Sequence, residues 1–283
     1  MKRILLTGAK GMLAHDFMES QKERFEIIPF DRDYLDITDI QQVEQRVQES
    51  QADIILNCAA YTNVDGAEDT GKKMNLDINV LGVFNLAKIA NRQNIDFITL
   101  STDYVFDGTK EGGYNENDEQ NPINNYGLAK YLGEKLACEV NPQSIIVRTS
   151  WLYGGGNEHK NFVNTMLKLS ETRNELRVIN DQFGSPTYVM DLSQALGDII
   201  GNIDTFRGKI LHLSNETSNN GITWFDFASE IFKMADRKIN LTPCTTEEYQ
   251  TKAVRPKFSK MNNNSSVQMR NWKEGLREYL SKP

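Results

Sequence analysis

The first half of the chain alternates short apolar runs with longer segments in which apolar residues recur every three or four positions. The runs predict buried strands, and the spaced segments predict helices. Strands are expected at 3–7, 25–30, 53–58, 95–100 and 144–149, and helices at 12–22, 38–49 (with Thr38 as N-cap), 71–92 and 126–139. This alternation predicts an α/β fold with a Rossmann-type, doubly wound parallel sheet that carries helices on both faces.

The second half is less regular and predicts a second, smaller unit. Helices are expected at 161–170, 190–202, 223–235 and 270–280, and strands at 176–180 and 209–213. The strand at 209–213 could return to the first sheet. We therefore expect a dinucleotide-binding domain made of residues 1–151 plus about 183–215. An interleaved α/β substrate domain would comprise about 152–182 plus 216–283.

Charge and composition exclude several classes of protein. Among 283 residues, 32 are Lys or Arg and 39 are Asp or Glu, so the formal net charge is −7. A net acidic chain without a basic block argues against nucleic acid as a partner. No apolar run approaches the roughly 20 residues that span a bilayer, and no signal peptide is recognisable. Three cysteines without a CxxC pair predict reduced thiols and a cytoplasmic protein, and three isolated histidines predict no metal site.

A glycine-rich turn links the first expected strand to the first expected helix. Gly8 permits the tight turn, Gly11 allows the backbone to approach a pyrophosphate, and Ala14 is small enough for close packing of the helix on the strand. The free N–H groups at the start of the helix favour a phosphate. The sequence therefore predicts a dinucleotide site here, with further contacts from Lys10, Met12 and Leu13.

The end of the second expected strand leaves the choice of dinucleotide open. Asp31 lies 20 residues after Gly11, where a carboxylate can bind the adenosine ribose, and this favours NADH. Arg32 beside it can instead bind a 2′-phosphate, which favours NADPH. The remaining expected cofactor contacts near the adenine and the third strand are Asp36, Ile37, Ala59, Ala60, Tyr61 and Thr62.

Three polar residues form the candidate catalytic group. Tyr126 and Lys130 are four residues apart in an expected helix, so they share a face, and a nearby ammonium can lower the pKa of a phenol. Lys130 can also hold a cofactor ribose. Thr102 ends the fourth expected strand, at the sheet edge where ligands bind in open α/β folds. A Thr, a Tyr and a Lys beside a dinucleotide indicate a hydride-transfer site.

Several motifs carry a resemblance to a known family. TGAKGMLA at 7–14, YGLAK at 126–130 and the preceding Thr102 resemble the extended short-chain dehydrogenase/reductase family. Within it, the chain is similar to the dTDP-4-dehydrorhamnose reductase family. That similarity rests on STDYVFDG at 101–108, RTSWLYG at 148–154, NDQFGSPT at 180–187, and Arg255-Pro256 with Ser259.

The resemblance implies an activity and a set of roles. Hydride from NADPH or NADH would reduce the C4 ketone of dTDP-4-dehydro-L-rhamnose, a dTDP-4-keto-6-deoxy sugar, to give dTDP-L-rhamnose for polysaccharide biosynthesis. Tyr126 would donate the proton, Thr102 would polarise the carbonyl, and Lys130 would tune Tyr126 and anchor the ribose. The implied further contacts are Asp103, Tyr104, Trp151 and Asn161 with the sugar nucleotide, and Asn79 with the active-site backbone.

Departures from the family pattern and rival functions also follow from the sequence. Some family members bind magnesium at a dimer interface, but the equivalent positions here are Asp16 and Met190. We therefore expect no metal, while another kind of homodimer stays possible.

A 4,6-dehydratase would need an acidic pair where Asp103 and Tyr104 stand. A reductase of another nucleotide 4-keto sugar and a non-catalytic regulatory subunit, such as that of methionine adenosyltransferase, remain as alternatives.

Overall fold

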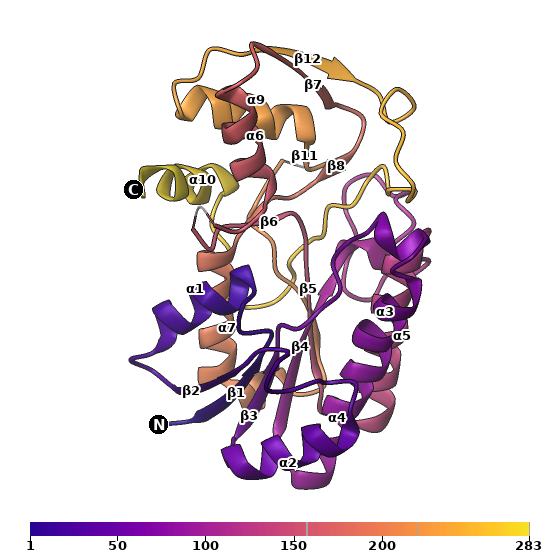
Figure 1. The fold of residues 1–283 in the computed structure, drawn as a ribbon, viewed down its shortest axis with the longest axis vertical. Helices are drawn as coiled ribbons and strands as arrows, with labels where there is room; N and C mark the ends of the chain where they lie inside the picture. The colour runs from indigo at the N-terminus through magenta and orange to yellow at the C-terminus, as the bar shows by residue number, and fades with distance from the viewer. Residues whose placement is uncertain (157, 219, 283) are drawn as a thin grey trace.

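The computed structural model describes residues 1–156, 158–218 and 220–282. Its centre is a six-stranded sheet with the order β10-β5-β4-β3-β1-β2, in which every neighbouring pair is parallel (Figure 1). The strands are β1 (Arg3–Thr7), β2 (Glu26–Phe30), β3 (Ile54–Asn57), β4 (Asp96–Thr102), β5 (Ile145–Thr149) and β10 (Ile210–His212). The predicted doubly wound α/β fold is confirmed, and the strand expected at 209–213 does return to the first sheet.

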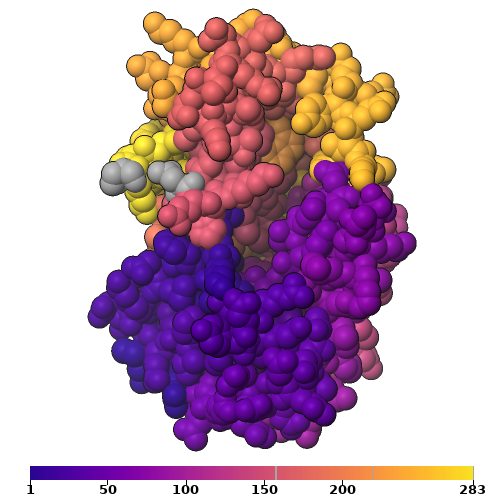
Figure 2. All heavy atoms as spheres, in the orientation of Figure 1, coloured from indigo at the N-terminus to yellow at the C-terminus, as the bar shows by residue number. Residues whose placement is uncertain are grey.

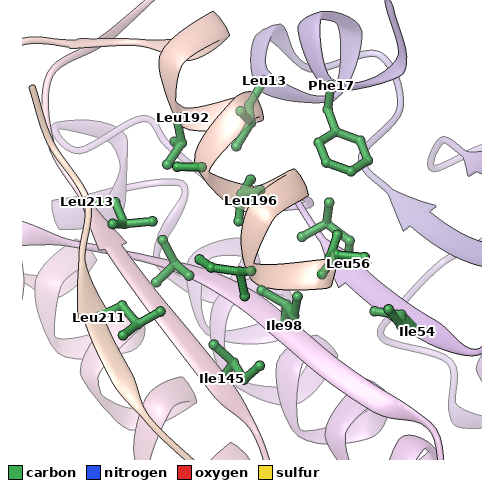
Figure 3. Close-up of a cluster of buried hydrophobic side chains, with 14 of the residues drawn as sticks. Leu13, Phe17, Ile54, Leu56, Ile98, Ile145, Leu192, Leu196, Leu211 and Leu213 are labelled. Atoms are coloured by element: carbon green, nitrogen blue, oxygen red, sulfur yellow. The ribbon is translucent and has the colours of Figure 1, made fainter. Parts of the chain in front are cut away.

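Helices cover both faces of this sheet. One face packs against α1 (Met12–Gln21) and α7 (Val189–Gly201); Figure 3 shows Leu13 and Phe17 of α1 meeting Leu192 and Leu196 of α7 above the strands. The other face packs against α2 (Ile40–Ser50), α4 (Val83–Gln93) and α5 (Asn125–Val140). Since strands buried on both faces must be apolar throughout, the continuous runs in the sequence have a direct cause.

The remaining elements pack above the carboxyl ends of the strands (Figure 1). Their own apolar cluster lies between α6, α9 and α10 and the β7–β12 pair. Figure 2 shows a recess where these pink and orange segments overhang the indigo and purple ones. The elements are β6 (Leu152–Tyr153), α6 (Phe162–Ser170), β7 (Glu175–Ile179), β8 (Phe183–Gly184), β9 (Thr187–Tyr188), β11 (Ile222–Thr223), α9 (Trp224–Met234), β12 (Asn240–Cys244) and α10 (Trp272–Ser281). The short helix α8 (Ile203–Phe206) instead follows α7 and packs into the core of the central sheet.

Local features differ from the sequence expectations in several places. The helix expected at 71–92 is divided into α3 (Lys72–Leu76), a π-helical turn η2 (Asp77–Gly82) and α4. The N-cap of α2 is Asp39 rather than Thr38, because the Asp39 carboxylate accepts from the amides of Gln41 and Gln42. The strand β12 was not predicted, since its sequence contains Pro243 and little apolar alternation.

A buried ionic network ties α5 to the sheet. Arg148 on β5 is fully buried and donates two hydrogen bonds to the Glu134 carboxylate of α5, at 2.9 and 2.7 Å. It also contacts Nε2 of His212 on β10, at 3.2 Å. The other ring nitrogen of His212 lies 3.2 Å from the backbone oxygens of Tyr114 and Asn262. These bonds require a neutral His212, with Nδ1 protonated.

This network predicts acid-sensitive stability. Burial and the neighbouring Arg148 lower the pKa of His212 to about 4, whereas an unfolded histidine titrates near 6.5. Between these values the unfolded chain binds the extra proton, so the free energy of unfolding falls as the pH drops from about 7 to about 4. Urea unfolding across this range should show a shallower fall for His212→Asn than for the wild type. The exposed control, His15→Asn, should keep the wild-type slope, and equal slopes for all three chains would contradict the assignment.

Candidate active site

The turn between β1 and α1 has the geometry of a phosphate site. Gly8 has a φ of +70°, and a Cβ there would lie 2.7 Å from the backbone nitrogen of Ala59. Only glycine therefore fits this position without strain. Gly11 is the N-cap of α1 and provides no side-chain hydrogen bond to the first turn. The amides at this end of α1 are consequently available to an anion.

A cavity of about 670 Å³ lies in front of this turn. It is lined by predicted residues from the ends of the first three strands. These are Gly8, Lys10, Gly11, Asp31, Arg32, Asp36, Ile37, Ala59 and Ala60. The cavity is large enough for part of a dinucleotide, and it lies at the sheet edge where such ligands bind.

Part of the cavity wall was missed by the sequence analysis. Thr70, Lys73, Met74, Asp77 and Ile78 reach it from α3, η2 and the turn before them. Their signal is hidden because the apolar period over 71–92 is that of one regular helix, although the segment is divided. The other missed residues of the wall are Asp33, Leu35, Thr38 and Cys58.

Charged side chains gather where the turn after β1 and the end of β2 line the cavity. The Lys10 ammonium lies 2.8 Å from the Asp31 carboxylate and 2.7 Å from that of Asp33. The hydrogen bond from Lys10 lowers the pKa of Asp31, while the two carboxylates raise the pKa of Lys10. Arg32 is exposed at the same edge. The cavity therefore holds both a carboxylate for ribose hydroxyls and cations for a phosphate.

Other expected cofactor residues lie outside the cavity wall. The side chain of Leu13 is in the hydrophobic core, so only its backbone can reach a ligand. Met12, Tyr61 and Thr62 are not part of the wall. Asn79 does act on the backbone, as expected: its amide accepts from the nitrogen of Tyr61 at 3.1 Å and donates to the oxygen of Tyr61 at 2.9 Å.

The candidate catalytic residues meet at the carboxyl end of β4. Thr102 is buried and donates to the Asp103 carboxylate at 2.9 Å. The rings of Tyr104 and Tyr126 are edge to face with centroids 5.8 Å apart. Burial raises the pKa of Asp103 to about 6, and hydrogen bonds from Ser259 and Thr102 oppose that rise. The Asp103 carboxyl group therefore accepts a hydrogen bond from the Thr102 hydroxyl inside a buried site.

The pKa of Tyr126 differs from the sequence expectation. Burial raises this pKa above its ordinary value, the negative charge of Asp103 adds to the rise, and a hydrogen bond with Thr102 opposes it. The prediction that Lys130 lowers the pKa is wrong for this arrangement. The Lys130 ammonium instead donates to the backbone oxygen of Leu100 at 2.6 Å. Burial lowers the pKa of Lys130 to about 8, and nearby Glu134 opposes that shift.

The expected sugar contact Trp151 belongs to an aromatic pair. Its indole stacks on that of Trp224, with centroids 3.5 Å apart and planes inclined by 9°. A Cβ at Gly184 would lie 2.6 Å from the Trp151 ring, so the ring is held between Trp224 and the backbone of β8. The φ of Trp151 is +47°, a conformation uncommon for a bulky residue. The sequence did not indicate that Trp224 stacks on Trp151, because Trp224 lies on α9, far along the chain.

Asn161 has a structural role in the observed arrangement. Its side chain caps α6 by accepting from the amide of Asn164 at 2.9 Å, and it donates to the oxygen of Gly154 at 3.3 Å. Its amide nitrogen also lies 3.8 Å from the sulfur of Met12, so it joins the phosphate turn to the overlying elements. Any contact of this amide with a substrate would compete with these bonds.

Comparisons with known proteins agree with this geometry. A family model described as RmlD substrate binding domain matches residues 1–283. The spore coat polysaccharide biosynthesis protein SpsK of Bacillus subtilis is 38% identical, over 99% of this chain and 97% of its own. The dTDP-4-dehydrorhamnose reductase of Aggregatibacter actinomycetemcomitans is 37% identical, over 98% of each chain.

Solved structures give the same result. The dTDP-4-dehydrorhamnose reductase of Clostridium acetobutylicum superimposes with a TM-score of 0.92 at 38% identity, over 98% of both chains. That of Bacillus anthracis, solved in complex with NADP, has a TM-score of 0.91 at 42% identity, over 99% of both chains. A dTDP-glucose 4,6-dehydratase and a UDP-glucose 4-epimerase, at 19% and 16% identity, share the fold.

Proposed function

Because this chain belongs to the RmlD substrate binding domain family, we propose that it is an NAD(P)H-dependent oxidoreductase that converts dTDP-4-dehydro-L-rhamnose to dTDP-L-rhamnose. The observation that carries the proposal is the group at the end of β4 that joins the buried Thr102 and Asp103 to the half-buried Tyr126. Lys130 is buried one helical turn after Tyr126 and donates to the backbone oxygen of Leu100 on β4. The relatives named as reductases support the same reaction.

The cavity fits a nicotinamide dinucleotide. Gly8, Gly11 and the start of α1 would hold the pyrophosphate, because a Cβ at Gly8 would collide with Ala59 and the helix amides are available. Asp31, Arg32 and Lys10 would surround the adenosine ribose, while Asp36 and Ile37 would lie near the adenine. When bound, the reduced nicotinamide supplies the hydride for the C4 carbon.

Side chains of this protein would donate the proton and polarise the carbonyl group. A raised pKa keeps the Tyr126 phenol protonated at neutral pH, and a proton donor to the forming C4 alkoxide must start in that state. Thr102 would turn its hydroxyl from Asp103 to the carbonyl oxygen and polarise it. Lys130, whose ammonium donates to the backbone oxygen of Leu100, would anchor the cofactor ribose.

We also infer which segments of the chain bind the cofactor and which bind the sugar nucleotide. Residues 1–151 with about 183–215 would bind the cofactor, and about 152–182 with 216–283 would bind the sugar nucleotide. Trp151 would contact the sugar nucleotide through its indole, with Tyr104 and Asn161 as further contacts.

No helix in the described part of the chain is long and apolar enough to cross a membrane. Homodimer formation and a cytoplasmic location stay predictions, and sedimentation and cell fractionation would test them.

Turnover with the keto sugar is the direct test of the proposed reaction. Oxidation of NADPH and of NADH is followed by absorbance, with and without enzymatically prepared dTDP-4-dehydro-L-rhamnose. Consumption that depends on the sugar and yields dTDP-L-rhamnose would establish the reductase. Cofactor binding without turnover would overturn this proposal and favour another 4-keto sugar or a non-catalytic binding subunit.

Arg32 gives a testable prediction about cofactor choice. Arg32→Ala should raise the KM for NADPH about 10- to 100-fold, because a charged hydrogen bond to the 2′-phosphate is worth roughly 1.5–3 kcal/mol. The KM for NADH should change less than about twofold, since NADH has no such group. Arg92→Ala, an exposed arginine of α4, is the matched control. An equal change in both KM values would show that Arg32 does not bind the 2′-phosphate.

A further inference from the structure

The amide side chains of Asn79 and Asn75 join the 59–62 loop, which we call the cofactor loop, to the helix that carries Tyr126. Asn79 binds both the nitrogen and the oxygen of Tyr61, next to the Ala59-Ala60 wall of the cavity. The second N–H of its amide donates to the side-chain oxygen of Asn75 at 2.8 Å. The Asn75 amide in turn donates to the backbone oxygen of Asn125, also at 2.8 Å. Asn125 is the first residue of α5 and directly precedes Tyr126.

Glu68 holds Asn125 from another element. Its carboxylate accepts from the backbone nitrogen of Asn125 at 2.7 Å and from the side-chain amide at 2.6 Å. Glu68 ends a short 3-10 turn, η1 (Gly66–Glu68), in the segment that follows the cofactor loop. Asn125 is therefore bound by its oxygen, its nitrogen and its side chain, and the first turn of α5 has little freedom to shift.

The two asparagines leave only one satisfactory arrangement of their amides. Asn75 and Asn79 are 1% and 0% exposed, so water cannot replace a lost partner. Rotating the Asn75 amide by half a turn would place its NH₂ against the Asn79 NH₂ and its oxygen against the Asn125 oxygen. An unpaired buried amide costs roughly 1–3 kcal/mol, which disfavours that alternative. A displacement of the Tyr61 backbone is thus transmitted to Asn125 rather than absorbed locally.

We propose that Asn75 is a positioning residue that couples the seating of the cofactor against the 59–62 loop to the placement of the Tyr126 hydroxyl. The inference rests on the proposed function, in which Tyr126 is the proton donor. It assigns to Asn75 and Glu68 a role that the sequence motifs did not indicate. Asn75 touches neither the substrate nor the cofactor and acts through Asn79 and Asn125.

The test uses the full chain and two readouts, one of which needs no substrate. Asn75→Ala removes both hydrogen bonds. Asn75→Asp keeps the acceptor for Asn79 and replaces the donor to Asn125 by a carboxylate oxygen. Asn91→Ala, an exposed asparagine of α4, is the matched control. For each chain we would measure the Kd of NADPH by its fluorescence, kcat with the keto sugar, and amide hydrogen exchange of residues 124–128 with and without NADPH.

The proposal predicts a split between binding and turnover. Both Asn75 variants should bind NADPH within about threefold of the wild type but lose about tenfold in kcat, because small misplacements of a reacting group are costly. In the wild type and in Asn91→Ala, NADPH should slow exchange at 124–128, and in both variants this slowing should disappear. If Asn75→Ala does not fold, Asn75→Asp alone carries the test.

Three results would overturn the coupling. They are a kcat within about twofold of the wild type, slowing of exchange that persists in the variants, and a loss of kcat that only follows a loss of NADPH binding. A wild type that binds NADPH but turns nothing over would instead contradict the proposed reaction. The exchange experiment would still decide the coupling in that case.

Discussion

Tyr126→Phe is expected to lower kcat by about 10²–10⁴-fold while the Kd of NADPH stays within about threefold. The phenol starts protonated, and it lies within hydrogen-bonding reach of Thr102. General acid catalysis by a positioned side chain contributes roughly this factor. The substitution removes one oxygen and keeps the ring that packs edge to face with Tyr104, so the site should keep its shape.

Stopped-flow and steady-state oxidation of NADPH with the keto sugar would measure this effect. Tyr131→Phe, a change of the same chemistry one turn further along α5, is the control and should keep kcat within about twofold. A kcat for Tyr126→Phe within tenfold of the wild type would show that another group donates the proton. The reductase reaction itself would survive that result, because the wild-type rate tests it separately.

The sequence predicted the parts of the site that are contiguous in the chain. The spacing of Gly8 and Gly11 after an apolar run describes a strand, a turn and a helix, and all three are local. Asp31 and Ala59 were found because strands of a parallel sheet end at one edge, so the ends of β2 and β3 must meet the turn after β1.

The parts that escaped prediction depend on packing between distant segments. Trp224 reaches Trp151 only because α9 packs above the sheet, and neither position carries a local sign of stacking. The π-helical turn at 77–82 brings residues of α3 to the cavity, but its sequence follows the same apolar period as the helix around it. The pKa of Tyr126 depends on burial and on the charge of Asp103, and helical spacing to Lys130 gave the wrong direction.

Arg148→Met is expected to lower the free energy of unfolding by about 3–5 kcal/mol, the largest change in stability among these predictions. Arg148 is fully buried, and Glu134, its partner, is 3% exposed. Removing the guanidinium leaves the Glu134 carboxylate without its two donors and His212 without a polar neighbour at Nε2. Urea unfolding at pH 7 would measure the loss. Arg24→Met, which breaks an exposed pair with Asp198, should cost less than about 1 kcal/mol.

A double variant without either charge shows how much of the loss in the free energy of unfolding comes from leaving the Glu134 carboxylate unpaired. In Arg148→Met with Glu134→Leu no buried carboxylate is left alone, so the double variant should be more stable than Arg148→Met by about 2 kcal/mol or more. The double variant should nevertheless turn over more slowly than the wild type. Glu134 lies one turn after Lys130 on α5, and its charge favours the protonated Lys130 ammonium that would hold the cofactor ribose. If the double variant were as unstable as Arg148→Met, the loss would come from the contacts of Arg148 with His212 and the backbone of Glu116 rather than from the stranded carboxylate.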